Sequence, residues 1–123
     1  MSSLEPAIEQ NAIQTDELLA RCMNRVALME RILDHFITNA TNDIAPLLAA
    51  VGEVDRDKIA SYSHKLKGTS LTVAAKPLAV LASQLQDQAA EASEIELEAL
   101  VNQLQAEFQR AQCFVTNMQR SSN

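Results

Sequence analysis

Apolar residues recur at intervals of three or four along most of the chain, which is the spacing of one face of an α-helix. The longest such series lies between residues 26 and 51, at Val26, Met29, Leu33, Phe36, Ala40, Ile44, Leu47 and Val51. Pro46 falls inside this series, where it removes the backbone hydrogen bond to Asn42. The pattern therefore predicts one long amphipathic helix that is kinked or loosened near Pro46.

Shorter patterns on either side predict two more helices. Thr15 is the expected N-cap of a short helix that ends near Cys22 and has acidic residues in its first turn. The tripeptide Gly52-Glu53-Val54 predicts a turn after the long helix. A further helix is expected to begin near Asp55, with its apolar face formed by Ile59, Tyr62, Leu66, Thr69 and Val73.

Two helices are predicted in the last third of the chain. One extends from Ala75 to Glu91, with Pro77 in its first turn and with Leu78, Leu81 and Leu85 on its apolar face. Ser93 is the predicted N-cap of the other, and Glu96 completes a capping box. Steps of four and three separate the apolar residues of this helix: Leu97, Val101, Leu104, Phe108, Ala111, Val115 and Met118. The residues from Gln119 onward are expected to fray.

The predicted fold class is all-α, because no stretch alternates apolar and polar residues as a strand would. Short connections favour an antiparallel up-down-up-down four-helix bundle with a short additional N-terminal helix. We expect an N-terminal segment at residues 1–14, the bundle at 15–119 and a frayed tail at 120–123. The last helix has heptad-like spacing and could instead pair with a second copy of itself. We favour a monomer, because the same apolar stripe can serve the bundle.

The composition supports a globular helical protein and narrows its possible partners. Hydrophobic residues form 47% of the 123 residues, with only 2 glycines and 3 prolines to interrupt helices. A net charge of −6 would repel the phosphates of a nucleic acid. The apolar run from Ile44 to Val51 is much shorter than the roughly 20 residues that cross a bilayer, and residues 1–10 do not resemble a signal peptide. We therefore expect a cytoplasmic protein that binds neither nucleic acid nor membranes.

The sequence shows no sign of a cofactor or a metal. Cys22 and Cys113 are isolated, and buried reduced thiols are their expected state. There is no set of carboxylates arranged for Mg²⁺, no Walker-type phosphate loop and no ATP-binding signature. The chain is therefore not expected to act as a kinase or to need a cofactor.

His64 is distinguished by the side chains around it. On a wheel of about 100° per residue, this histidine lies opposite the apolar face of its helix and should face solvent. The residues beside it are mostly small or apolar: Ala60, Ser61, Lys67, Gly68 and Leu71. A glycine inside a helix costs about 1 kcal/mol relative to alanine. Gly68 would have a purpose if a side chain at that position would lean over the imidazole.

This neighbourhood suggests a phosphoryl carrier. A neutral imidazole is a nucleophile near pH 7, and the Lys67 ammonium can reach a group attached to His64. Small neighbours would let a second protein approach closely. His35 also lies opposite its own apolar stripe, but its neighbours are ordinary polar residues and no role is expected for it.

Gly68 has a second possible explanation. It could end the helix as a C-cap, with Lys65 and Lys67 near the negative end of the helix. The residues that follow, from Thr69 to Val73, are weak helix formers. The apolar stripe nevertheless continues in phase through Val73, which argues against an end at Gly68.

The segment from His64 to Gly68, HKLKG, resembles the His-x-Leu-Lys-Gly signature of histidine-containing phosphotransfer (HPt) domains. Phe36 and the leucine-rich stretch from Leu78 to Gln86 also resemble this family, and the resemblance extends roughly from Asp16 to Val115. In the family, the histidine accepts a phosphoryl group from the aspartate of a receiver domain and passes it to another receiver. The resemblance thus implies a carrier whose partners are receiver domains of response regulators or hybrid histidine kinases.

By this resemblance, His64 is the phosphorylated residue, Lys67 assists the phosphohistidine and Gly68 permits docking. The expected docking face consists of Ala60, Ser61, Lys65, Gly68 and Leu71. Two positions depart from the family pattern. Ala74 stands where many members have a second glycine, and we expect it to tighten a helix locally. Ser63 replaces the common alanine before the histidine, which would alter partner preference.

Two other classes of function stay open at this point. The chain could be an interaction module that binds receivers without transferring anything, or a structural dimer built on the helix from Leu97 to Met118. An enzyme with its own active site is the least expected, because no second catalytic group accompanies His64.

Overall fold

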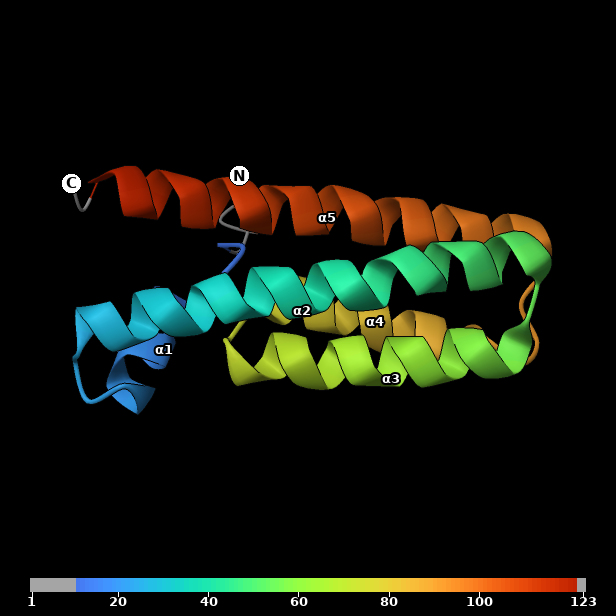
Figure 1. The fold of residues 1–123 in the computed structure, drawn as a ribbon. Helices are drawn as coiled ribbons and strands as arrows, with labels where there is room; N and C mark the ends of the chain where they lie inside the picture. The colour runs from blue at the N-terminus through green and yellow to red at the C-terminus, as the bar shows by residue number, and fades with distance from the viewer. Residues whose placement is uncertain (1–10, 122–123) are drawn as a thin grey trace, which may run out of the picture.

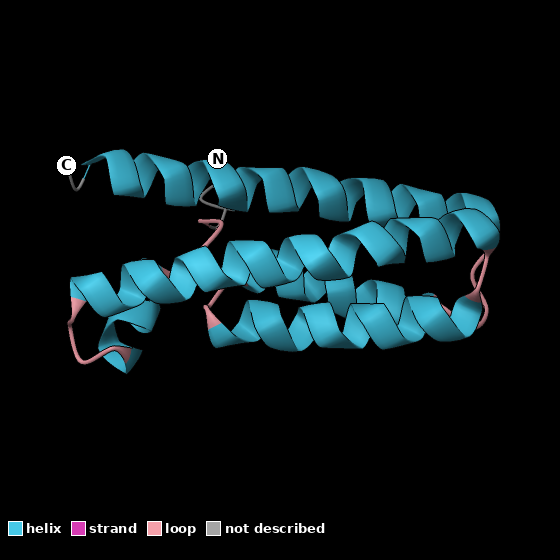
Figure 2. Cartoon of the chain, viewed as in Figure 1, coloured by secondary structure: helices cyan, strands magenta, loops and turns pink. Residues whose placement is uncertain are grey.

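The structure is a computed structural model that describes residues 11–121. It contains five helices, shown in Figure 1: α1 (Thr15–Arg21), α2 (Val26–Glu53), α3 (Arg56–Thr72), α4 (Lys76–Gln88) and α5 (Glu94–Ser121). Within this range no strand is present (Figure 2). The helix α5 includes residues 120 and 121 of the expected tail, and residues 122–123 lie outside the described range.

The helices α2 to α5 run in alternating directions, and each packs against the next (Figure 1). The last of them, α5, also packs against α2, which closes the bundle. The prediction of an all-α four-helix bundle with a short N-terminal helix is therefore confirmed. In this arrangement α3 packs against α2 and α4, and no other described helix covers its outer side.

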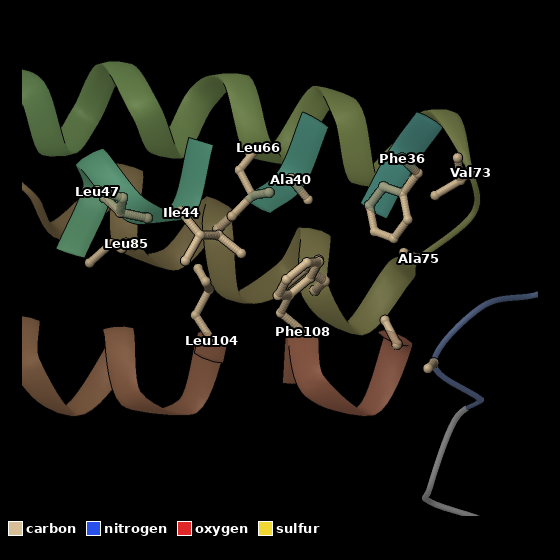
Figure 3. Packing of buried hydrophobic residues seen from close by; sticks show 14 of the residues in the cluster. Phe36, Ala40, Ile44, Leu47, Leu66, Val73, Ala75, Leu85, Leu104 and Phe108 are labelled. Carbon is tan, nitrogen blue, oxygen red and sulfur yellow. The ribbon is translucent and has the colours of Figure 1, made fainter. Parts of the chain in front are cut away.

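One apolar core occupies the interior of the bundle. Figure 3 shows side chains from four helices meeting there: Ile44, Leu66, Leu85 and Leu104. The rings of Phe36 and Phe108 meet edge to face, with centroids 6.4 Å apart. Every predicted apolar position of α5 before Met118 is buried in this core. The stripe of α5 that could pair with a second copy therefore forms part of the bundle core.

The N-terminal helix α1 is attached to the connection between α3 and α4. The Gln14 N–H donates a hydrogen bond to the Ala74 carbonyl at 2.9 Å. The Arg21 guanidinium donates to the carbonyls of Leu71 and Thr72, each at 3.0 Å. The Leu71 carbonyl also accepts from the Ala74 N–H at 3.1 Å, so the end of α3 and its connection to α4 are held by both backbone and side-chain donors. Part of the segment predicted at 1–14 also belongs to the fold, since Ala12 and Ile13 are buried.

Two local predictions about α1 and α2 were wrong. Thr15 is the first residue of α1, and Gln14 takes the N-cap position without a side-chain hydrogen bond. The helix α2 contains Pro46 and continues through Gly52 to Glu53, so the predicted turn does not include these last two residues. The turn begins at Val54, which adopts a left-handed conformation with φ 53°. The sequence does not predict a left-handed residue at Val54, because a β-branched residue rarely adopts that conformation.

The predicted start of α3 near Asp55 and the predicted capping box of α5 are confirmed. The Asp55 carboxylate accepts a hydrogen bond from the Lys58 N–H at 3.2 Å. In the capping box, the Glu96 N–H donates to Ser93 Oγ at 3.1 Å, and the Ser93 N–H donates to Glu96 Oε1 at 2.8 Å. The bond from the Ser93 N–H lowers the pKa of the Glu96 carboxyl. The cap is therefore complete at neutral pH and weakens as acid protonates Glu96.

The two cysteines differ in burial. Cys22 is buried as expected, but Cys113 is exposed, so the prediction for Cys113 was wrong. Cys113 follows the buried Ala111 by two residues, and this spacing places it on the outer side of α5.

Candidate functional site

The candidate site lies on the outer side of α3, around His64. The ring of His64 is exposed, while Leu66, two residues later, is fully buried in the core (Figure 3). This is the placement that the helical wheel predicts. The helix continues without a break from Arg56 to Thr72, and its C-cap is Val73. The alternative in which Gly68 ends the helix is therefore wrong.

Gly68 has no packing reason inside the chain. It lies in the interior of α3 without a positive φ, and a Cβ atom added there would meet no described atom within 4 Å. Leu71, one turn later on the same side, is 46% exposed. Ser61 is also exposed, and Ala60 is half-buried. The surface beside the imidazole is therefore open and partly apolar, with bare backbone at Gly68.

Gln86 of α4 is a site residue that the sequence analysis missed. Its Nε2 atom lies 3.2 Å from His64 Nδ1. This hydrogen bond holds one ring nitrogen and leaves Nε2 of His64 without a partner among the described residues. Gln86 ends the leucine-rich stretch that resembles the HPt family, but no feature of the sequence alone shows which residue of α4 faces His64.

The two lysines beside His64 have different environments. Lys65 Nζ lies 3.4 Å from Asp43 Oδ1 of α2, and Asp43 is only 7% exposed. This ion pair draws Lys65 toward α2. Lys67 is half-buried and forms no ion pair with any residue in the described range. The Lys67 ammonium is therefore not held by a carboxylate of the described residues, in contrast to that of Lys65.

Ala74 does not lie in a helix, so the expected tightening of a helix at this position was wrong. It belongs to the short connection between α3 and α4, where its φ is 59° and its side chain is buried. The chain reverses there within three residues, which requires a left-handed residue. Glycine adopts that conformation more readily than alanine. This left-handed conformation explains why many HPt domains have a glycine at this position.

Ser63 is fully buried, although it directly precedes the exposed His64. A partner cannot contact this side chain, so Ser63 cannot alter partner preference by direct contact as expected. The Ser63 hydroxyl has no hydrogen-bond partner in the described part of the chain.

We expect Ser63→Ala to increase the free energy of unfolding by about 1 kcal/mol, because it removes an unpaired buried hydroxyl and favours the helix. Urea denaturation followed by circular dichroism would measure the change. Ser61→Ala is the matched control, since Ser61 is exposed on the same helix and gains only helix propensity. Equal changes in the two variants would contradict the account of Ser63.

Residues 11–121 contain neither a candidate metal site nor a candidate membrane span. No group of three or more His, Cys, Asp or Glu side chains is arranged to hold a metal ion. No helix in this range has the length and apolar character that a membrane span requires.

The comparisons with known proteins agree with this geometry. The family model of the Hpt domain matches residues 31–112, about two thirds of the chain, including all of α3 and α4. The chain belongs to the Hpt family. As an Hpt domain it takes part in histidine phosphotransfer in two-component phosphorelays, and it is a phosphocarrier rather than a catalyst. Membership also implies binding to receiver domains.

A solved structure shows the same fold. The chain is similar to histidine-containing phosphotransfer protein B (HptB) from Pseudomonas aeruginosa PAO1, with a TM-score of 0.82 and 19% sequence identity. The similarity covers 92% of this chain and 98% of that one. No curated protein sequence matches the chain.

Proposed function

We propose that this Hpt domain accepts a phosphoryl group on His64 from the aspartyl phosphate of one receiver domain and passes it to the aspartate of another. The observation that carries the proposal is the exposed imidazole of His64, held at Nδ1 by Gln86 and flanked by the open surface at Gly68. A receiver can therefore bring its aspartate to the ring without displacing a side chain of this domain.

The direction of the hydrogen bond to Gln86 decides which ring nitrogen of His64 can react. A neutral imidazole attacks phosphorus through the nitrogen that carries no hydrogen. If Nδ1 carries the hydrogen and donates it to the Gln86 amide oxygen, Nε2 is the nucleophile. A half-turn of the amide exchanges its oxygen and nitrogen, so the observed 3.2 Å contact accommodates this arrangement.

The proposed step is balanced without a further reactant. A bond forms between Nε2 and phosphorus while the bond from phosphorus to the receiver carboxylate oxygen breaks. The hydrogen on Nδ1 stays in place, so no proton has to leave. Transfer to the second receiver reverses the step. Such transfers depend mainly on alignment and on neutralisation of the phosphoryl charge, and Lys67 is the cation of this domain that is placed to contribute.

The direct test mixes the protein with receiver domains from the same organism that carry a radioactive phosphoryl group. We expect the label to move to this chain and to be lost in acid but retained in base, as for a phosphohistidine. The label should then move on to a second receiver. If receivers bind but no label is transferred, the chain is an interaction module and the proposed function is wrong.

Lys67→Ala should slow transfer or shorten the lifetime of the phosphorylated form by about tenfold, since a hydrogen bond to a charged group is worth about 1.5–3 kcal/mol. The decay of label after removal of the receiver would measure the lifetime. Lys65→Ala is the matched control, because Asp43 already holds that ammonium. If the two variants behave alike, Lys67 has no special role.

A further inference from the structure

Charged side chains are unevenly distributed around His64. The contact between His64 and Gln86 marks the surface shared by α3 and α4, whereas the pair of Lys65 and Asp43 marks the opposite side of α3, toward α2. We call the exposed surface of α3 and α4 around His64 the transfer face. Its two ends carry opposite charge.

The acidic end lies toward the start of α3 and the end of α4, which meet at the same end of the bundle (Figure 1). Asp57 precedes His64 by seven residues, which is two helical turns on the same side of α3. Asp87 directly follows Gln86 on the outward side of α4. Both carboxylates are exposed, and neither forms an ion pair with another residue of the described chain. Two cations lie at the same end: Lys58 pairs with Asp55, and the Arg56 guanidinium donates to the carbonyls of Ala89 and Ala92. Three carboxylates thus stand against two cations, and this end is net negative by one charge.

The basic end lies toward the α3–α4 connection. Lys67 follows His64 by one turn, and Lys76 begins α4. Lys76 Nζ lies 2.8 Å from Glu17 Oε1, and the other oxygen of Glu17 binds the Arg21 guanidinium. The hydrogen bond from Lys76 lowers the pKa of Glu17, which keeps this carboxylate ionised. This end therefore carries the three positive charges of Lys67, Lys76 and Arg21 and the one negative charge of Glu17, so it is net positive.

The distance between the ends decides how a partner encounters them. Ten residues of helix separate Asp57 from Lys67, or about 15 Å at about 1.5 Å per residue. This exceeds the screening length of about 8 Å at physiological ionic strength. The ends therefore act as two separate patches on either side of the imidazole, and a partner that fits both in one orientation would meet like charges if it were turned around.

We propose that the receiver docks on the transfer face in one orientation, with an acidic surface over Lys67 and Lys76 and a basic surface over Asp57 and Asp87. The inference rests on the proposed function, because it takes the partner to be a receiver. In-line transfer requires the receiver aspartate to meet His64 from one direction. Charge pairing at both ends of the transfer face fixes that direction before the short-range contacts form.

The test compares two double variants with the same change in net charge. Asp57→Asn/Asp87→Asn removes the acidic end of the transfer face. Glu94→Gln/Glu98→Gln removes two exposed carboxylates from the same end of the bundle, but from α5, which does not contact α3. The probe is a receiver domain from the same organism that exchanges label with the unmodified protein, or otherwise one that binds it. Stopped-flow fluorescence would measure the association rate, and circular dichroism would confirm folding.

We expect the first variant to lower the association rate constant by about fivefold at low salt and the second by less than about twofold. The difference should vanish at about 1 M salt, where the screening length is about 3 Å. Equal effects of the two variants, or no effect of either, would overturn the inference. This failure is separate from failure of the proposed function, because binding without transfer refutes transfer alone. If no receiver binds at all, both fail.

Discussion

We expect His64→Gln to take up no phosphoryl group from a phosphorylated receiver, while its helical content and its free energy of unfolding stay close to those of the unmodified protein. Glutamine lacks the ring nitrogen that would attack phosphorus, so the loss of label should be complete rather than partial. The exposed position of His64 explains the unchanged stability, since no core contact is removed. Labelling for a fixed time and denaturant unfolding would measure the two effects.

The second histidine provides the matched control. His35 is exposed on α2, and His35→Gln should be labelled as fully as the unmodified protein. A labelled His64→Gln variant, or loss of label in His35→Gln alone, would place the phosphoryl group elsewhere and refute the assignment of His64.

Gly68→Gln should change binding and stability in opposite directions. Glutamine favours a helix interior by somewhat less than 1 kcal/mol over glycine, and no described atom obstructs a Cβ at this position, so the free energy of unfolding should rise. The new side chain would lie beside His64 on the transfer face. We expect it to weaken receiver binding by at least about tenfold, which corresponds to about 1.4 kcal/mol. Denaturation and titration calorimetry would measure the two quantities.

Gly52 is the matched control for this substitution. It is also exposed inside a helix, with no described atom within 4 Å of an added Cβ, but it lies in the last turn of α2 and not on α3 or α4, which carry the transfer face. Gly52→Gln should leave receiver binding unchanged. If Gly68→Gln binds receivers as well as Gly52→Gln does, the glycine does not serve docking.

The sequence predicts the helices well because burial on one face leaves a local, periodic trace. The stripe of α5 is an example, as is the exposure of His64, which follows from counting residues around α3. Contacts between helices leave no such trace. The hydrogen bond of Gln86 to His64 and the ion pair of Asp43 with Lys65 depend on how two helices are aligned, and a single sequence does not encode that alignment in its spacing.

Local exceptions were missed for a different reason. Turn prediction depends on glycine, asparagine and proline, but Val54 and Ala74 adopt left-handed conformations without belonging to that group. At these two positions the packing of the flanking helices overrides the preference of the residue. Gly52 misled the prediction in the opposite way, since it is part of α2.

The attachment of α1 to the end of α3 matters to anyone who shortens this protein for experiments. The limits of the family match, residues 31 and 112, would delete α1 and truncate both α2 and α5. A fragment cut there would lose the guanidinium of Arg21 from the carbonyls of Leu71 and Thr72, one turn beyond Gly68. It would also uncover core residues that Ile13 and Leu18 now shield. Expression of residues 11–121, or of a longer segment, would keep the transfer face together with the contacts from α1 that hold the end of α3.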